Sequence, residues 1–490
     1  MENSVDSYGV PDATLGALRT SPDVLSFSES EMRRLGYLVV DAVVDHIQSV
    51  DSRRPTSMAG DDVLTSAVAG PLPSLPSALD ANVAALVEVT ADYQQHDDHR
   101  RFFARVPGPS SFPGILGDWL ATGMQSTVSA WQSAPGPSTV EMVVCQWLSE
   151  ALGLCGTWDG ILVSGGSMAN LTAIVTARVC NGPGIVYLSD QTHISITRGL
   201  ASIGWAPEDI RIIPSDSAYR FDPGALAAAV EKDVAAGLRP SIVVATTGTT
   251  NTGAFDDLDA IAKISAANGM WLHVDAAYGG PAAMCERGRA QLSGLRHADS
   301  LIVDPHKWLF QPFGIGCLLV KRPGCLERAF AMNPEYLADL ADGGVNFYDR
   351  GLELTRRARA FQLWLTLRTY GREALAGAID RCMALAEYAQ HVIELNPVFR
   401  IVTPAQLGIV TFEVLHLTDA GHADVIKRMA SEGFAAAGST VLDGRTILRL
   451  CTTNPRTTTD DIRETVDHIA KLADSAAVTM LRPFPTLESS

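Results

Sequence analysis

The strongest constraint on the fold is a regular alternation of short apolar runs with helical patterns between about residues 160 and 320. Apolar runs such as ILV at 161–163, IVYLS at 185–189 and IVVAT at 242–246 are each followed by a helical pattern. Strands that alternate with helices in this way form a mainly parallel sheet whose two faces are covered by helices. The sequence therefore predicts a large α/β domain, which we place at residues 112–375.

The segments on either side of this domain have different patterns. Residues 1–111 begin with a stretch, up to about residue 26, that lacks periodicity, and an amphipathic helix follows with Ser28 at its N-cap. Residues 51–77 are rich in Ser, Pro, Asp and Gly, which favours a loop. Residues 376–490 mix helical patterns with strand-like runs. We expect an N-terminal arm and helical domain, the α/β domain, and a small C-terminal α+β domain.

Charge and cysteine usage exclude several classes of protein. Lys and Arg total 38 against 55 Asp and Glu, which gives a formal net charge of −17. Binding to nucleic acid or to an anionic membrane surface requires a basic surface, so we expect neither partner. The eight cysteines form no Cys-x-x-Cys pair, no metal site is predicted, and no signal peptide or membrane-spanning run is visible. We expect a cytoplasmic protein.

Polar residues cluster where the predicted strands end. In open α/β sheets, ligands bind outside the carboxyl ends of the strands. Four clusters occupy such positions, at residues 164–168, 190–193, 273–277 and 304–308. We therefore expect a binding site among these four segments.

The first cluster is a glycine turn, in which Gly165 and Gly166 join a strand to a helix that opens with Ser167 and Met168. The free backbone N–H groups and the dipole at such a helix start can bind an anion, although many turns of this kind have no ligand. Asp275 ends another apolar strand, where a carboxylate needs a partner. It either serves as a cap or forms a salt bridge, or it holds the cationic ring nitrogen of a ligand.

The remaining clusters supply a histidine and a lysine. His193 begins a helix, where it either caps the helix or stacks on a planar ligand. Lys307 closes an apolar strand between His306 and Trp308, a setting in which desolvation makes an amine nucleophilic enough to form a Schiff base. A lysine, a carboxylate and an anion site together match the needs of pyridoxal phosphate.

These motifs resemble the pyridoxal-phosphate-dependent amino acid decarboxylases of the aromatic amino acid/glutamate decarboxylase group. The resemblance rests on RRFFARVPGPSSFP (100–113), SDQTHIS (189–195), VATTGTTNTGAFD (244–256), HVDAAYGG (273–280), DPHKW (304–308) and the helix RRARAFQLWLTLRTYG. It extends from about residue 25 to 475. It implies a fold type I enzyme that binds pyridoxal 5'-phosphate, with a mainly parallel sheet, an N-terminal helical arm and a small C-terminal domain. It also implies a homodimer with the active site at the subunit interface.

The resemblance carries roles onto individual residues. Lys307 is similar to the lysine that binds the cofactor covalently, Asp275 to the partner of the ring nitrogen, and His193 to the imidazole that stacks on the ring. Further contacts are expected with the cofactor from Ser167, Met168, Thr246, Ala277, Asp304 and His306, and with the substrate from Arg105, Pro107 and Gly108.

Two features of the motifs are left open by the sequence: the identity of the proton donor and the role of Asp304. The expected proton donor is a tyrosine on a mobile loop at about 332–352, where Tyr348 is the best match and Tyr336 a substitute. Asp304 stands where the aromatic decarboxylases tend to have asparagine near the phosphate. Because an aspartate would repel a phosphate, either its side chain points away or the phosphate is held differently.

The sequence predicts decarboxylation of an L-amino acid, with aromatic substrates (tryptophan, tyrosine, phenylalanine or DOPA) favoured. A first alternative is an acidic or aliphatic substrate such as glutamate, cysteine sulfinate or diaminobutyrate, with Arg105 able to pair with an acidic one. A second alternative is aldehyde synthesis or transamination on the same scaffold. A scaffold without activity is disfavoured because both Lys307 and Asp275 are present.

Overall fold

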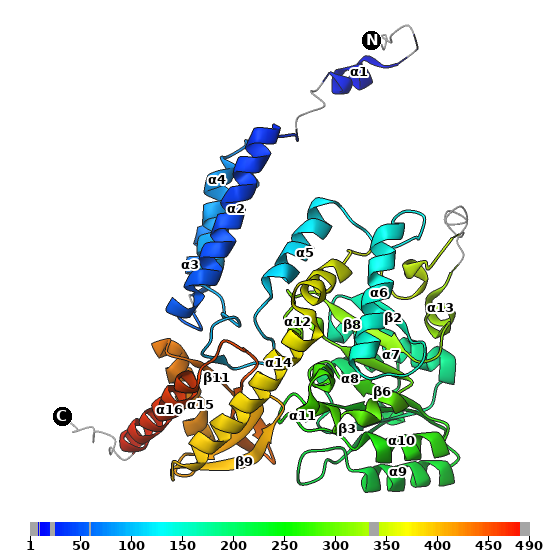
Figure 1. The fold of residues 1–490 in the computed structure, drawn as a ribbon, viewed down its shortest axis with the longest axis vertical. Helices are drawn as coiled ribbons and strands as arrows, with labels where there is room; N and C mark the ends of the chain where they lie inside the picture. Colours follow the sequence, from blue (N-terminus) through cyan, green and yellow to red (C-terminus); the bar gives the residue numbers. More distant parts are fainter. Residues whose placement is uncertain (1–7, 9, 20–24, 58–59, 333–342, 481–490) are drawn as a thin grey trace, which may run out of the picture. The chain divides into compact units, whose positions relative to one another are not determined.

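The computed structural model divides the chain into two compact units, Met1–Gln95 and His96–Ser490 (Figure 1). The described residues are 8, 10–19, 25–57, 60–332 and 343–480. The domain boundaries that we placed after residues 111 and 375 stay predictions.

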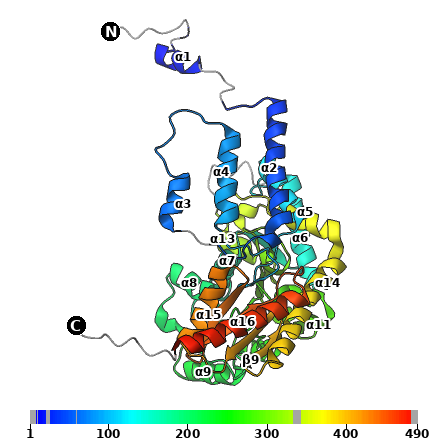
Figure 2. The same ribbon diagram turned by 90° about the vertical axis from the view of Figure 1, so that its left-hand side faces the viewer.

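The N-terminal unit is helical. Its elements are α1 (Asp12–Leu18), α2 (Glu29–Ser49), the 3-10 turn η1 (Val50–Ser52), α3 (Asp61–Val68) and α4 (Leu79–Asp92). As predicted, Ser28 caps α2, because its hydroxyl accepts the Glu31 backbone N–H at 3.2 Å. Helices α2 and α4 lie side by side (Figure 2) and are joined by an ion pair between Arg34 and Asp80 of 2.7 Å.

Two short helices of this unit lie where we predicted no regular structure. Helix α1 lies in the stretch before residue 26 that we predicted to lack structure, and α3 lies in the predicted loop 51–77. Each has at most about two turns, and an apolar period is recognisable only over a window of about 11–18 residues. Short helices of this kind therefore leave no pattern in the sequence.

A seven-stranded sheet forms the body of the second unit. Its strands are β2 (Asp159–Val163), β3 (Ile185–Ser189), β4 (Ile210–Ile213), β5 (Pro240–Thr246), β6 (Trp271–Asp275), β7 (Ser300–Val303) and β8 (Gly316–Val320), in the order β2-β8-β7-β6-β5-β3-β4. In this sheet β8 alone runs antiparallel to both of its neighbours. The prediction of a mainly parallel sheet is confirmed.

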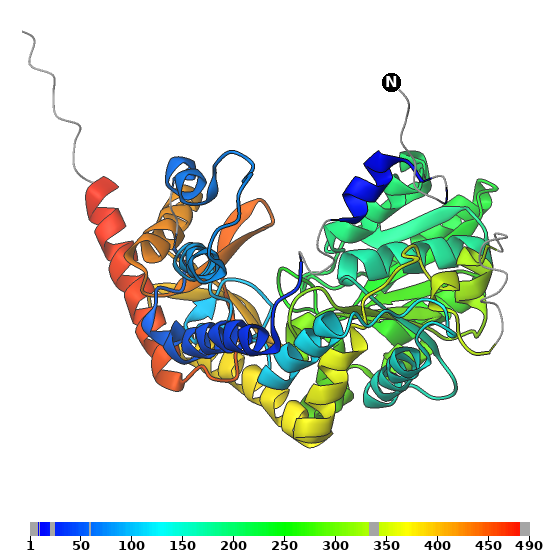
Figure 3. The ribbon, with the colours of Figure 1, turned by 90° about the horizontal axis from the view of Figure 1, so that it is seen from above.

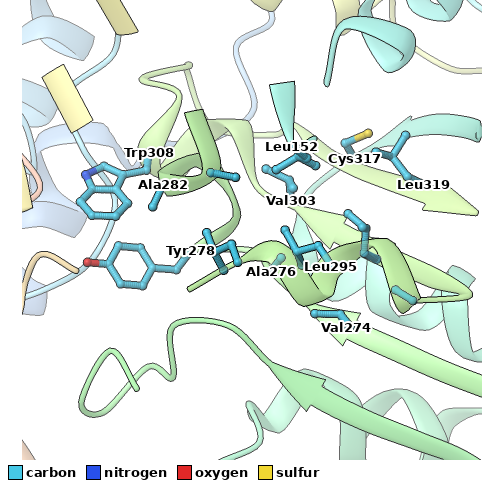
Figure 4. Packing of buried hydrophobic residues seen from close by; sticks show 14 of the residues in the cluster. Leu152, Val274, Ala276, Tyr278, Ala282, Leu295, Val303, Trp308, Cys317 and Leu319 are labelled. Carbon is cyan, nitrogen blue, oxygen red and sulfur yellow. The ribbon is translucent and has the colours of Figure 1, made fainter. Parts of the chain in front are cut away.

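Helices cover both faces of this sheet. One face carries α6 (Pro135–Ala151), α9 (Pro223–Ala235) and α10 (Leu258–Ala267), and the other carries α7 (Gly166–Asn181), α8 (Ile194–Ser202) and α13 (Cys325–Phe330). Alternate residues of each strand enter separate hydrophobic clusters, as Tyr187 and Leu188 of β3 do. Figure 4 shows part of the first cluster, with Tyr278 and Trp308 at one end and their ring centroids 4.8 Å apart.

A five-stranded sheet forms the C-terminal part of this unit, in the order β1-β11-β12-β10-β9. Its elements are β1 (Phe102–Phe103), β9 (Phe399–Gln406), β10 (Ile409–Val414), β11 (Ala436–Leu442), β12 (Arg445–Cys451), α15 (Asp419–Glu432) and α16 (Thr459–Met480). Helix α16 lies on the side of this sheet away from the larger one (Figure 3). Helix α14 (Ala360–Glu394) packs on both parts and is interrupted at Gly371, whose φ of 74° is outside the helical range and favours glycine.

Shorter elements complete the second unit. They are α5 (Phe112–Gly123), η2 (Pro207–Asp209), η3 (Gly280–Met284), α11 (Glu286–Arg289), η4 (Ser293–His297), α12 (Pro305–Trp308) and η6 (Phe347–Asp349). Among the helices of the described ranges, none combines the length and the apolar character needed to cross a lipid bilayer.

Candidate active site

A cavity of about 320 Å³ lies at the carboxyl ends of β2, β6 and β7. Three of the four polar clusters contribute several of its lining residues and the fourth contributes His193. The lining consists of Ser164, Gly165, Gly166, Ser167, Met168, Asn170, His193, Ser195, Asp275, Ala277, Asp304, His306 and Lys307. Segments far apart in the sequence thus meet where the sheet topology predicts a ligand site.

The glycine turn opens one wall of the cavity. Gly165 has a φ of 139°, which strongly favours glycine, and α7 begins at Gly166. A Cβ atom on Gly166 would collide with the carboxylate of Asp304. The turn therefore needs glycine twice, and it leaves the first N–H groups of α7 beside the cavity, where they can bind an anion.

Lys307 lies in a helical turn and not at the end of a strand as we predicted. Strand β7 ends at Val303, and α12 (Pro305–Trp308) follows because proline cannot donate to the sheet but fits the first turn of a helix. The turn aims Lys307 into the cavity, where its Nζ lies 3.1 Å from Asp304 Oδ2.

Asp304 lines the cavity, so its side chain does not point away, which was the first of the two alternatives considered from the sequence. It is buried, and its Oδ1 has no hydrogen-bond partner among the described residues. His306 Nδ1 donates to the Ile315 carbonyl at 2.7 Å, and its Nε2 lies 3.8 Å from Asp304 Oδ2. Asp304 thus sits among two potential cations and the start of α7, all of which favour a negative charge there.

Asp275 is the last residue of β6 and is held by two donors. Its Oδ1 accepts the Ala277 backbone N–H at 3.1 Å, and its Oδ2 accepts the Asn170 side-chain N–H at 3.0 Å. His193 is the N-cap of α8, as predicted, and its Nδ1 lies 2.8 Å from Ser195 Oγ. Burial lowers the pKa of His193, and the charge of Asp275 opposes this shift.

Two lining residues, Asn170 and Ser195, were not predicted. Asn170 lies three residues after Ser167, which places both on one face of α7. Asparagine in a helix interior is unfavourable unless its side chain has a partner. That combination was the signal available in the sequence.

The structure does not bring every predicted residue to the cavity. Thr246 pairs with Asp275 across β5 and β6 and is buried, but it does not line the cavity. Tyr348 is buried in η6 and does not line it either. Tyr336 lies outside the described residues.

The predicted substrate residues lie on the segment beside Lys307. Gly108 donates its N–H to the Lys307 carbonyl at 3.2 Å, and the Pro107 carbonyl accepts the Thr453 hydroxyl at 3.1 Å. Arg105 is exposed and lies outside the cavity lining.

The lining fits pyridoxal phosphate in three respects. Lys307 offers an amine for the aldehyde, Asp275 a carboxylate for the ring nitrogen, and the start of α7 an anion site for the phosphate. Asp304 is the one group that opposes a phosphate, and Lys307 and His306 lie next to it.

Comparisons with known proteins identify the family. A model of the pyridoxal-dependent decarboxylase conserved domain matches residues 76–415. An aromatic-L-amino-acid decarboxylase from Bacillus atrophaeus is 36% identical, over 93% of this chain and 98% of its own length. A phenylacetaldehyde synthase from Arabidopsis thaliana is 31% identical over 91% and 96% of the two chains. An L-2,4-diaminobutyrate decarboxylase from Rhizobium meliloti is also 31% identical, over 96% and 99%.

A solved structure gives the same answer at the level of the fold. The crystal structure of Oryza sativa TDC with PLP and tryptamine superposes with a TM-score of 0.87 at 28% identity, covering 92% of this chain and 99% of that one. The family match spans most of the sequence, and the fold and the cavity agree with it. The chain therefore belongs to the pyridoxal-dependent decarboxylase family and is a pyridoxal phosphate-dependent amino acid decarboxylase.

Proposed function

We propose that the chain converts an aromatic L-amino acid to its amine and carbon dioxide, using Lys307, Asp275 and His193 as its catalytic residues. The observation that carries this proposal is the cavity that joins these three side chains to the start of α7. Pyridoxal phosphate, when bound, supplies a conjugated ring that accepts the electron pair of the bond between Cα and the carboxylate.

The side chains of the cavity have distinct tasks. Lys307 would hold the cofactor through its side-chain amine. Asp275 keeps a proton on the ring nitrogen, which makes the ring a better electron acceptor. His193 would face the cofactor ring, and Ser167 and Met168 would contribute the backbone groups that bind the phosphate. Carbon dioxide then leaves and one proton is added at Cα, so the chain must also supply a proton donor.

We assign that proton to a tyrosine of the segment 332–352, with Tyr348 as the first candidate and Tyr336 as the second. The two are compared directly by Tyr348→Phe and Tyr336→Phe. The variant that lacks the donor should bind cofactor normally while it makes amine slowly or makes aldehyde instead. If neither variant changes the product or the rate, the donor lies elsewhere.

An aromatic substrate is favoured over an acidic one by the position of Arg105. Its exposed side chain lies outside the cavity lining. Burial raises the pKa of the Asp97 carboxyl, and the Arg105 guanidinium partly offsets that rise, so Arg105 already has an acidic neighbour. The similarity to the aromatic-L-amino-acid decarboxylase adds support.

We further propose a homodimer. Helices α2 and α4 of the N-terminal unit line an apolar groove of about 360 Å³ with side chains that include Val39, Leu86 and Val87, all of them exposed in the single chain. Exposed apolar surface of this kind is typical of an interface. Light scattering during gel filtration gives the mass directly, and a monomer of 52.3 kDa would contradict the proposal.

The function is tested by a product assay. The purified protein is incubated with pyridoxal phosphate and each of tryptophan, tyrosine, phenylalanine, DOPA, glutamate, cysteine sulfinate and diaminobutyrate, and products are identified by mass spectrometry. Tryptamine, tyramine or a related aromatic amine is expected, and Lys307→Ala should give none. A non-aromatic amine as the main product would refute the proposed substrate class. Aldehyde with ammonia would refute the proposed outcome of the reaction.

A further inference from the structure

A chain of buried hydrogen bonds extends from the interior of the sheet to the cavity. Trp271 Nε1 donates to Ser300 Oγ at 2.8 Å, and Ser300 Oγ lies 2.8 Å from His273 Nδ1. His273 Nε2 lies 3.0 Å from Asn170 Oδ1. Asn170 Nδ2 then donates to both Asp275 Oδ2, at 3.0 Å, and Ser195 Oγ, at 2.9 Å.

The orientation of the Asn170 amide is fixed from the cavity side. A carboxylate can only accept hydrogen bonds, so the NH2 group of Asn170 must face Asp275. The reversed amide would place two oxygens 3.0 Å apart in a buried site, where such repulsion is strong. The Asn170 oxygen therefore faces His273, and His273 must carry its proton on Nε2.

The hydrogen bonds at the Trp271 end of the series lead independently to the same tautomer of His273. An indole N–H can only donate, so Ser300 Oγ accepts from Trp271 and has its own proton left to give to His273 Nδ1. Burial lowers the pKa of His273 to about 4, which keeps the ring neutral with one proton. All donors in the chain thus point from Trp271 toward the cavity.

The direction continues to His193. Ser195 Oγ accepts from Asn170, so its proton is available to His193 Nδ1, 2.8 Å away. The Ser195 backbone N–H also points to this nitrogen, at 3.3 Å. With two donors on Nδ1, the ring holds its own proton on Nε2, for which no partner is recorded among the described residues. A ligand in the cavity therefore meets an N–H and not a lone pair.

We propose that Asn170 is a positioning residue of this site: it orients the Asp275 carboxylate and, through Ser195, holds His193 as the neutral tautomer with its proton on Nε2. The inference rests on the proposed function only in that His193 and Asp275 face the cofactor. It assigns the tautomer of His193 that a ligand in the cavity meets, and it attributes the choice of that tautomer to Asn170 of α7.

The test is Asn170→Asp, with Asn181→Asp as the matched control. Both residues belong to α7, and the Asn181 amide also donates twice, to the Ser241 carbonyl at 2.8 Å and the Gly269 carbonyl at 3.1 Å, away from the cavity. Two measurements start from the cofactor-free protein: an NMR experiment without cofactor and a titration with pyridoxal phosphate. Nitrogen-15 NMR of labelled histidine reports the tautomer of His193, whose signals are identified with His193→Gln. Fluorescence titration gives the affinity for pyridoxal phosphate.

Asn170→Asp is expected to shift the His193 proton toward Nδ1, because Ser195 would then donate to the new carboxylate. It should also weaken pyridoxal phosphate binding by about tenfold or more, because a second carboxylate beside Asp275 removes a charge-assisted hydrogen bond. Asn181→Asp should leave both measurements unchanged. An unchanged tautomer together with unchanged affinity in Asn170→Asp would overturn the proposal.

Ser195→Ala provides a second test if Asn170→Asp fails to fold. It keeps the bond between Asn170 and Asp275 and removes the hydroxyl that donates to His193. Only the longer backbone N–H contact of 3.3 Å then remains on Nδ1, so the fraction of His193 with its proton on Nδ1 should rise while the cofactor affinity falls less. A wild-type tautomer in Ser195→Ala would overturn the proposal. The NMR measurement needs no substrate and no turnover, so a wild-type protein that released no carbon dioxide would refute the proposed function without touching this result.

Discussion

Arg356 and Arg357 are neighbours that make ion pairs of nearly equal length in very different surroundings. Arg356 Nη2 lies 2.6 Å from Glu141 Oε1, with side chains 1% and 0% exposed. Arg357 Nη2 lies 2.7 Å from Asp118 Oδ1, with side chains 55% and 29% exposed. Removing one partner of a buried pair strands a charge and costs about 3–5 kcal/mol. An exposed pair contributes about 0–1 kcal/mol. Arg356→Met should therefore destabilise the fold several times more than Arg357→Met.

The surroundings of Arg356 support the larger figure. Its Nη1 donates to the Val128 carbonyl at 3.2 Å, its Nη2 also donates to the Leu162 carbonyl, and its guanidinium lies 5.0 Å from the Phe347 ring centroid. Each of these groups would lose a partner in Arg356→Met.

The measurement is urea denaturation of the wild type and both variants, followed by circular dichroism and by tryptophan fluorescence so that a common midpoint can be verified. Arg356→Met/Glu141→Leu is included because it removes both charges, and it should recover most of the lost stability. Equal losses in the two single variants would refute the reasoning that burial decides the value of these pairs. A double variant as unstable as Arg356→Met would show that packing, and not the stranded carboxylate, causes the loss.

Three further predictions concern the site and the core. Gly166→Ala should weaken pyridoxal phosphate binding in a fluorescence titration. Gly136→Ala at the start of α6 is the control and should bind normally, because a Cβ there meets nothing within 4 Å. Equal binding by both variants would contradict the crowding at the glycine turn. Burial raises the pKa of Asp256 from 3.8 to about 7, so the folded chain keeps a proton that the unfolded chain releases, and the stability of wild type relative to Asp256→Asn should fall between about pH 4 and 7 and then level off. Tm measured against pH checks this, and a rising difference would be the wrong sign. Trp308→Ala should lower the free energy of unfolding by about 3–5 kcal/mol, because Trp308 is fully buried against Tyr278; a loss under about 1 kcal/mol in urea denaturation would mean that the core refills the space.

The parts of the fold that were predictable are those with a local pattern. The strands of the large sheet were recognisable because each is buried on both faces and is therefore apolar along its length, as at Ile242–Ala245. Asp275 and His193 were placed correctly because each directly borders such a strand or the helix after it. The order of the strands was not predictable, since pairing between distant segments leaves no trace in either one.

The parts that were missed depend on tertiary contacts or on one residue's backbone chemistry. Lys307 was assigned to a strand because the apolar run before it was given more weight than Pro305, which cannot continue a sheet ladder. Asn170 was overlooked because the surrounding helix pattern explained the segment without it. Its importance comes from His273 and Asp275, which are more than a hundred residues away in the sequence.

The reversed strand β8 also governs when the site can form during synthesis. Strand β2 lies at the edge of the sheet, and among the described residues β8 is its only strand partner, although all the other strands of the sheet are made between the two. The glycine turn that follows β2 has no sheet to join until β8 has left the ribosome. A nascent chain that already contains Asp275 and Lys307 therefore still lacks one wall of the cavity, and tight capture of the cofactor follows release of β8.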